Sequence, residues 1–580
     1  MMTKPLLLRK KILPEKGLYK RIDWVCMSLL SLLFSFFMVF GESFYKAASW
    51  NMVFGSTSQE VVALCKGLLF FVLFMFCFYF GWHFVAYPAL RPLESPSKFR
   101  IMRLFDTYPF LFSWICFFLL YIPYFIAFYP GIIMSDTPDL IAQGFNLPDR
   151  TSDYLVLLNP EITLNQHHSV AHIMLLHICL VIGHLITDDW NVGLFIYSMF
   201  QACIMITVCS FCISELKKIG INRRYRLLVF VYFVASPRIQ NYLFLATKDA
   251  IYAAALLAFI MCFYCIIANH YKKYHMVCFM AALIVMLLFR NDNKYLLVLM
   301  FMLTAVLIKK CRKWCCIMVP CILVAMYCYT SILLPSCGIT PGSKREMLSI
   351  PFQQTARYLR DIPDSEITEE EKAAINAVLD YDVIKTQYDP ERSDNVKNTF
   401  RETATSDDLI RYFKSWVGML YKHPGIYIQA TMNNVYDYFY PCGRPAGRYT
   451  TSFSDTCIDY IEWKYPNMHF GFHYNPNTAT LRNLMEYYDA LFCLPIFSLI
   501  LTPAFYSWVV IICSIAALRR YNPNAFCVWL PMLITLLICI AGPCNGWYFR
   551  YLYPVAVAFP IGCVIHLKEC SAEGRTTEKP

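Results

Sequence analysis

Long apolar runs are the feature that most limits how this 580-residue chain can fold. A helix that crosses the hydrocarbon core of a bilayer needs about 20 mostly apolar residues. Thirteen runs are candidates, at 24–41, 62–88, 108–129, 168–187, 190–212, 225–246, 249–268, 276–289, 295–308, 313–335, 490–517, 525–542 and 551–567. Apolar residues make up 58% of the chain and charged residues 16%, against about 45–50% and about 25% in soluble domains. The sequence therefore predicts an all-α multi-span membrane protein.

Basic residues predict how the spans are oriented, because short cytoplasmic loops are rich in Lys and Arg. The net charge of +11 is spread over short clusters between the apolar runs, which does not favour nucleic acid as a partner. If all thirteen runs crossed the membrane, the basic loop 217–226 and every later basic loop would face outward. We therefore interpret run 168–187, which carries four histidines, as a helix at the outer surface. The prediction is twelve spans with both termini in the cytoplasm.

This topology divides the chain into five parts. They are a cytoplasmic tail with two leading spans (1–107), a transmembrane core with a first outer loop at 130–189 (108–335), a mixed extracytoplasmic domain (336–489), three C-terminal spans (490–567) and a cytoplasmic tail (568–580). Within the outer domain, residues 366–380 read as a helix with an acidic first turn. Cys442 and Cys457 are either one disulfide or two unpaired thiols.

Several polar residues fall where spans end on the outer side. Asp136 follows the third run, and Lys248, Arg290 and Arg550 lie in three separate outer turns. Charged residues at a membrane are costly and are functional candidates. A carboxylate can accept the proton of an attacking hydroxyl, and cations offset charge on a leaving phosphate. The structural alternatives are a helix cap for Asp136 and contact with lipid headgroups for the three cations.

A metal site is weakly indicated. His168 and His172 have the i, i+4 spacing of a helical ligand pair, and His167 is adjacent, but no third ligand is evident. The chain has no GxGxxG, P-loop or HExxH motif. The sequence therefore identifies no cofactor, and a divalent metal is left as an alternative.

The first outer loop resembles that of the glycosyltransferase C (GT-C) superfamily, integral-membrane enzymes that use lipid-linked sugar donors. The resemblance rests on Tyr129-Pro130-Gly131, then Asp136 and Gln143, then a His-rich surface helix. The chain is more closely similar to an uncharacterised bacterial membrane-protein family of this type. The further matching pieces are Lys248-Asp249, Arg290-Asn291, residues 348–354 with Ala356-Arg357, Tyr388-Asp389-Pro390 with Asp394 and Lys397, and Arg550-Tyr551 before Tyr553-Pro554.

The resemblance implies an outward-facing glycosyltransferase in the bacterial cytoplasmic membrane, among membrane lipid. It would move a sugar from a polyprenyl-phosphate donor to a cell-envelope acceptor, with Asp136 as the base. Lys248, Arg290 and Arg550 would bind the donor phosphate. Possible substrate contacts are Asp139, Gln143, His167, His168, Asp249, Asn291, Gln354 and Tyr551.

The chain departs from this pattern at two points. Ser169 follows His168 where relatives tend to have Pro, and Asp136 and Asp139 are three residues apart where some members have adjacent acids. A polytopic transporter or lipid flippase is the rival interpretation, and a membrane scaffold whose outer domain binds a partner is a third.

Overall fold

The structure is a computed structural model of the 580-residue chain. It describes residues 19–89, 97–133, 136–147, 149–155, 162, 164–443, 470–494, 497–542, 545–546 and 548–571. Within these residues every regular element is a helix, and extended segments pair only as four isolated bridges. The all-α prediction is thus confirmed for the described chain. The mixed character predicted for 336–489 is wrong for its described residues, which are helical.

Eight helical stretches are long and apolar enough to cross a membrane. They are α1 (Arg21–Ala47), α3 (Thr57–Ala86), α5 (Pro109–Ala127), α8 (Val170–Thr187), α9 (Trp190–Lys218), α12 (Asp249–Ile267), the stretch Lys309–Ser336 that includes α15 (Arg312–Tyr327), and α26 (Pro523–Ala541). Three shorter apolar helices are α13 (Lys273–Phe289), α14 (Asn293–Leu307) and α25 (Pro503–Arg519). The chain is therefore a multi-pass membrane protein, and the count of twelve spans stays a prediction.

Two predicted spans are not continuous helices. Run 225–246 divides into α10 (Arg223–Ala235) and α11 (Pro237–Leu243), and run 490–517 divides into α24 (Ala479–Leu491), η8 (Phe497–Leu501) and α25. In both cases the new helix begins at a proline, which has no N–H to donate and fits the first helical position. The last run becomes α27 (Tyr553–Cys570) as predicted.

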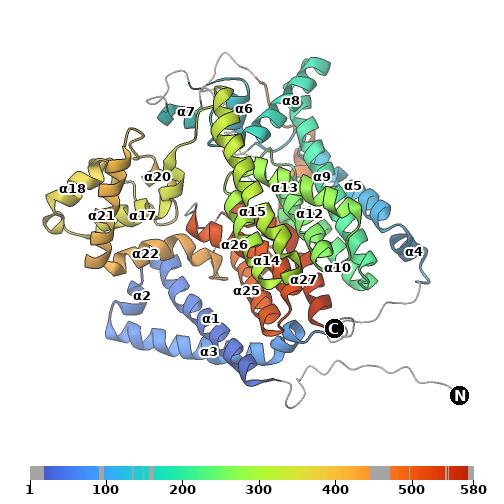
Figure 1. Cartoon of the computed structure of the whole chain (residues 1–580), viewed down its shortest axis with the longest axis horizontal. Helices are drawn as coiled ribbons and strands as arrows, with labels where there is room; N and C mark the ends of the chain where they lie inside the picture. The colour runs from blue at the N-terminus through green and yellow to red at the C-terminus, as the bar shows by residue number, and fades with distance from the viewer. Residues whose placement is uncertain are drawn as a thin grey trace.

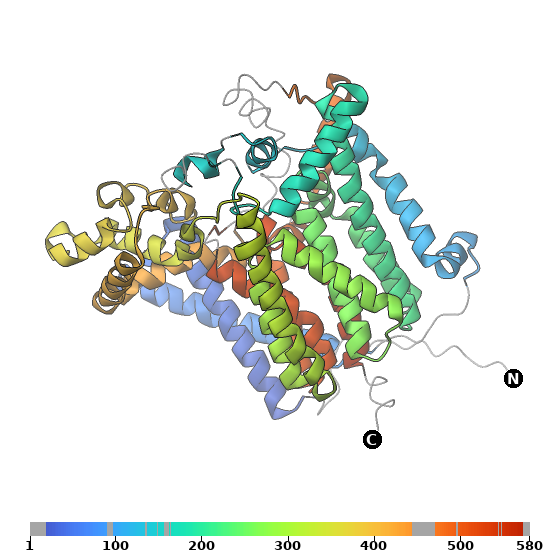
Figure 2. The same cartoon turned by 45° about the horizontal axis from the view of Figure 1, so that its top comes forward.

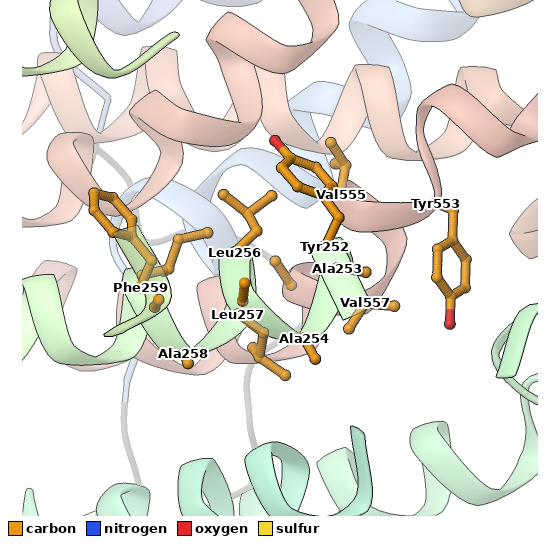
Figure 3. Close-up of a cluster of buried hydrophobic side chains, with 14 of the residues drawn as sticks. Tyr252, Ala253, Ala254, Leu256, Leu257, Ala258, Phe259, Tyr553, Val555 and Val557 are labelled. Carbon is orange, nitrogen blue, oxygen red and sulfur yellow. The ribbon is translucent and has the colours of Figure 1, made fainter. Parts of the chain in front are cut away.

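Helix α12 is the centre of the bundle. Nearly all of its residues are buried, and it packs against α9, α13, α26 and α27. Small side chains such as Ala253, Ala254 and Ala258 lie between its larger apolar residues, beside Val555 and Val557 of α27 (Figure 3). Small residues let membrane helices approach closely. This packing fixes the first residues of α12, which belong to the candidate site.

Helices α8 and α9 form a crossed hairpin (Figures 1 and 2). His172 Nε2 lies 2.6 Å from Tyr197 Oη, and Gly183 is packed on the backbone of Gly193. Between these contacts α8 advances eleven residues (172 to 183) while α9 covers four (193 to 197), so the helices are inclined to each other. Helix α8 meets the length and composition of a span, and its position at the membrane surface stays a prediction.

Gly183→Ala should destabilise the α8–α9 hairpin. A Cβ on Gly183 would lie well under 3 Å from the backbone of Gly193, so the helices would have to separate, at a cost of about 1–3 kcal/mol. Thermal unfolding of the purified protein measures the loss. The matched control is Gly81→Ala in α3, where a Cβ meets nothing within 4 Å and should be neutral or slightly stabilising. Equal Tm values for the two variants would contradict the close crossing.

The domain predicted to be extracytoplasmic, called the outer domain, has a core of its own. Its helices are α17 (Ser349–Asp361), α18 (Glu369–Asn376), α19 (Tyr381–Ile384), α20 (Asp394–Lys397), α21 (Ser406–Lys422) and α22 (Pro424–Val435). Buried residues such as Phe352, Tyr412 and Met419 form a cluster separate from that of the membrane helices. The predicted acidic-start helix is confirmed as α18, shorter than 366–380, with Thr368 and Glu371 forming a capping box. Cys442 is exposed, and Cys457 lies outside the described residues.

The remaining short elements connect the longer helices. They are α2 (Asn51–Phe54), α4 (Arg100–Thr107), α6 (Thr137–Gly144), α7 (Arg150–Leu155), α16 (Leu334–Ser336), η1 (Lys309–Cys311), the π-helical η2 (Cys328–Leu333), η3 (Lys344–Leu348), η4 (Asp364–Glu366), η5 (Tyr436–Tyr438), η7 (Pro476–Thr478) and η9 (Phe549–Tyr551).

A buried ion pair joins the N-terminal hairpin to the rest of the bundle. Arg519 of α25 donates from Nε and Nη2 to the two carboxylate oxygens of Asp23 in α1, each at 2.8 Å. Trp82 and Tyr87 donate to the same carboxylate at 3.0 and 2.9 Å, and Asp23 is fully buried. The pair lies at the opposite end of the bundle from the outer domain, which packs on the other end of α1.

Candidate functional site

The segment after α5 is clamped to the segment before α12. The amide of Ile132 donates to Phe244 O at 2.8 Å, and the amide of Ala246 donates to Ile132 O at 2.9 Å. Thr137 Oγ1 donates to Ala246 O at 3.2 Å. Gly131 leads into this clamp with a φ of +152°, and a Cβ there would collide with Ser198 Oγ. The clamp brings Asp136 next to Lys248 and Asp249, which are over 100 residues away in sequence.

Arg550 of η9 bridges two aspartates. Its Nη1 lies 2.6 Å from Asp136 Oδ2, and its Nε lies 2.6 Å from Asp249 Oδ2. Asp249 is buried in the first turn of α12 and also accepts from Thr247 Oγ1 at 2.9 Å. The structure therefore brings Asp136 and Asp249 within hydrogen-bond reach of Arg550, and all three are residues of the predicted site.

Two further cations complete the group. Arg290, at the end of α13, stacks over the ring of Tyr252 at 5.0 Å and lies 3.6 Å from Asp292. Lys248 precedes α12, and among the described residues its ammonium has no hydrogen-bond or ion-pair partner. Burial, followed by the positive charges of Arg290 and Arg550, lowers the pKa of Lys248. An ammonium in this environment would be stabilised by an added anion.

The carboxyl group of Asp136 is strongly held in its charged form. Burial alone would raise its pKa, but the charge of Arg550, with a further contribution from Lys248, outweighs burial and holds the pKa well below the usual range. The neighbouring His168 is buried, and burial together with His167 keeps its pKa well below 6.5. At neutral pH the site thus has an ionised Asp136 beside an uncharged imidazole.

A second charged cluster, from the outer domain, borders this group. Lys397 is buried and lies 2.7 Å from Glu346 and 2.8 Å from Asp394. Asn545 accepts from the amide of Ser393 at 3.0 Å, which docks the outer domain on the last outer loop. Tyr551 lies between the two clusters, and the charges of Asp136, Asp394 and Lys397 all act on its hydroxyl.

His167 connects the first outer loop to the outer domain. Its Nδ1 lies 2.9 Å from Tyr154 Oη, and the guanidinium of Arg345 stacks over the Tyr154 ring at 3.4 Å. Asn291 donates to Gln166 O at 3.1 Å, which ties the α13–α14 turn to the same loop. These contacts place His167 and Asn291 beside the site as residues that hold its loops together.

Three other predicted contacts have structural partners. Gln143 donates to Asp149 and Thr151 at 2.6 and 2.9 Å within the folded first loop. Asp139 is buried in the first turn of α6. Gln354 lies inside the outer domain, between Thr431 and Trp416 at 2.9 and 3.1 Å. Gln143 and Gln354 thus form hydrogen bonds within the first loop and within the outer domain, respectively.

Sequence analysis missed Tyr252, Asp292 and Glu346 as parts of the site. The signal for Asp292 was available, because it lies in the same polar turn as Arg290. Tyr252 lies inside an apolar run, and Glu346 lies far along the chain, so no spacing pointed to either one. Tyr252, Arg290 and Asp292 also line a pocket together with Asn293, Leu296, Thr535, Ile538 and Cys539, between α12, α14 and α26.

The one group of three possible metal ligands among the described residues lies elsewhere. Glu215, Cys265 and His275 have ligand atoms within 4.8 Å of one another, at the C-terminal ends of α9 and α12. The backbone amide of Lys272 donates to His275 Nδ1 at 2.8 Å, so the ring proton is on Nε2, which donates to Glu215 at 3.1 Å. A ligating Nε2 would need the opposite tautomer. These three side chains therefore do not fit a metal site. In this cluster the buried carboxylate of Glu215 is held by a hydrogen bond from His275.

The fold and the site define an integral membrane protein with a group of charged residues at one end of its helix bundle. Residues 148–579 match a family of unknown function (DUF6020), and this match covers about three-quarters of the chain. The chain belongs to that family. The matched region begins after Asp136. No curated protein and no solved structure matches the chain.

Proposed function

We propose that the protein is a membrane glycosyltransferase that takes a sugar from a polyprenyl-phosphate donor and transfers it to a cell-envelope acceptor. The observation that carries the proposal is Lys248, a half-buried lysine whose ammonium has no contacting counterion among the described residues, with Arg290 and Arg550 near enough to lower its pKa. Lys248 and Arg550 act on the carboxylate of Asp136, and Arg290 acts on Lys248. Such a group is suited to a phosphate that leaves and a hydroxyl that attacks.

In the proposed reaction Asp136 accepts the proton of the acceptor hydroxyl. The hydroxyl oxygen forms a bond to the anomeric carbon, and the bond between that carbon and the phosphate oxygen breaks. The electron pair of the broken bond stays on the phosphate, whose charge is offset by Lys248, Arg290 and Arg550. No metal is needed for this charge balance, since the three cations can supply it.

The ion pair between Asp136 and Arg550 suggests how the donor would activate the base. A carboxylate whose pKa is held well below the usual range is a weak proton acceptor. A donor phosphate would compete with Asp136 for the Nη1 side of Arg550, while Asp249 keeps the Nε side in place. Loss of this contact would raise the pKa of Asp136, so that the base becomes effective when the donor is bound.

A lipid-linked donor is favoured over a soluble one by the position of the cations. The pocket beside Arg290 lies between α14 and α26, and both helices expose apolar side chains such as Leu299 and Leu537. In a multi-pass membrane protein such faces contact lipid. A phosphate attached to a lipid would therefore reach Arg290 from the bilayer with its tail in hydrocarbon.

Lys248→Gln should raise the KM for the donor about 10- to 100-fold, because charge-assisted bonds contribute about 1.5–3 kcal/mol each. Transfer of radiolabelled sugar from polyprenyl-phosphate donors in proteoliposomes measures the change. The matched control is Lys294→Gln on the α13–α14 side of the site, where the ammonium lies 5.2 Å above the Tyr295 ring. An unchanged KM in Lys248→Gln would remove Lys248 from the phosphate site.

The transporter or flippase alternative lacks a comparable observation. Transporter sites usually lie near the bilayer midplane between related halves. Here the charged group lies where α12 begins and α13 ends, at one end of the bundle.

A further inference from the structure

Helix α21 of the outer domain has an exposed apolar face that neither the site nor the domain core uses. Tyr412 and Met419 point into the core and are fully buried. Ile410, Val417 and Tyr421 are 53%, 40% and 83% exposed. Their spacings of seven and four residues place them on one face of the helix. This α21 face, defined by Ile410, Val417 and Tyr421, therefore points away from the domain.

Helix α21 packs beside α22, the helix that rests on the tip of the α1–α3 hairpin. One residue separates α21 from α22, which packs on that tip (Figures 1 and 2). The amide of Trp50 donates to Gln429 Oε1 at 3.2 Å, and Asn433 donates to Ala48 O at 2.9 Å. A Cβ on Gly425 would lie 2.9 Å from the Trp50 ring. The outer domain thus rests directly on the point where the hairpin turns.

The hairpin tip marks a boundary between lipid and water. Val61 and Leu64, in the first turns of α3, are 55% and 64% exposed, and Phe54 in α2 is 53% exposed. Such a row of exposed apolar residues on a membrane-spanning helix faces lipid. The polar residues between α1 and α3 must then lie at the membrane surface, and α21 begins and ends within the domain that sits on them.

The residues around the α21 face suit the headgroup region of a bilayer. Tyrosine is enriched at membrane interfaces, where its ring is half-buried and its hydroxyl is wet. Lys414 is exposed on the same side, and its ammonium has no ion-pair partner among the described residues. Lysine at this depth can reach lipid phosphates.

We propose that α21 lies on the membrane surface with Ile410, Val417 and Tyr421 among phospholipid headgroups, and that this contact holds the outer domain against the bilayer. The contact is independent of the chemistry proposed at Asp136. It would limit how far the outer domain can tilt from the membrane helices.

Photo-crosslinking tests this contact. Benzoylphenylalanine is introduced at Val417 in the full chain, which is reconstituted into phosphatidylethanolamine–phosphatidylglycerol vesicles and irradiated. We expect phospholipid adducts by mass spectrometry, at least about fivefold above those at Val383, which is also 40% exposed but lies on α19 of the same domain. A second position is Tyr421, where one aromatic group replaces another and folding is least disturbed.

Three outcomes would overturn the proposal. They are adducts to another protein chain in place of lipid, which would make the α21 face a protein interface, equal lipid labelling at Val417 and Val383, and no lipid adduct at either Val417 or Tyr421. Lipid adducts at both α21 positions with little at Val383 would support it.

Discussion

Replacing Asp136 by Asn should reduce sugar transfer by about 10²- to 10⁴-fold, the usual contribution of a general base. The amide cannot accept the proton of the acceptor hydroxyl, but its carbonyl oxygen can still accept a hydrogen bond from Arg550. Arg550 also keeps its 2.6 Å contact with Asp249. The variant should therefore fold normally, bind donor and lose the chemical step. Single-turnover transfer in proteoliposomes, with donor binding measured separately, distinguishes these effects.

The matched control is Asp188→Asn in the same outer loop. The side chain of Asp188 is 95% exposed and lies outside the charged group. Its backbone has a φ of +55°, which Asn tolerates, so neither transfer nor stability should change. If Asp136→Asn transferred sugar at the rate of this control, Asp136 would not be the base. If the protein moved lipid across the membrane without transferring sugar, and Asp136→Asn abolished that movement, the flippase alternative would be favoured.

Asp23→Ala should cause the largest loss of stability of any single substitution considered, about 3–5 kcal/mol. Removing one member of a buried ion pair leaves the other as an uncompensated charge. Arg519 would keep its charge at a position where its side chain is 8% exposed, and Trp82 and Tyr87 would lose their acceptor. The free energy of unfolding is measured by thermal or denaturant unfolding of the purified protein. The separation of α1 and α3 from α25 is monitored in the same experiment.

Two comparisons make this prediction specific. Glu42→Ala removes a surface carboxylate from the other end of α1, where it pairs with Lys46 and Lys66, and should cost about 0.2–1 kcal/mol. A double variant, Asp23→Leu with Arg519→Leu, should recover part of the lost stability, because no charge stays buried. If Asp23→Ala lost no more stability than Glu42→Ala, the buried pair would not stabilise the bundle as proposed.

Much of the bundle could be predicted from sequence because lipid imposes a simple pattern. A helix across the hydrocarbon core satisfies its own backbone and needs an apolar surface, so runs such as 249–268 and 525–542 became α12 and α26 nearly as predicted. The failures came at Pro237 and Pro503. Hydropathy does not detect the missing N–H of proline. Each of these two apolar runs was therefore predicted as one helix, although a new helix begins at the proline.

The candidate site was predicted in part for a different reason. Asp136, Lys248, Arg290 and Arg550 stood out because charge near a membrane is costly, and this rule needs no knowledge of packing. Gln143 and Gln354 were chosen by resemblance, and the structure gives each of them structural hydrogen bonds. Glu346 and Tyr252 carried no signal, because their relation to the site depends on contacts between distant segments.

By itself the sequence determined the class of the protein and the end of the helices at which its charges gather, since the bilayer sorts residues by hydropathy and charge alone. Only the tertiary structure decided the pairing. The clamp between Ile132 and residues 244–246 and the packing of α27 on α12 bring Asp136, Asp249 and Arg550 within hydrogen-bond reach. Arg550 contacts both aspartates, and Lys248 has no contacting counterion among the described residues. That outcome depends on distances of a few ångströms between segments far apart in the chain, which no local pattern of residues encodes.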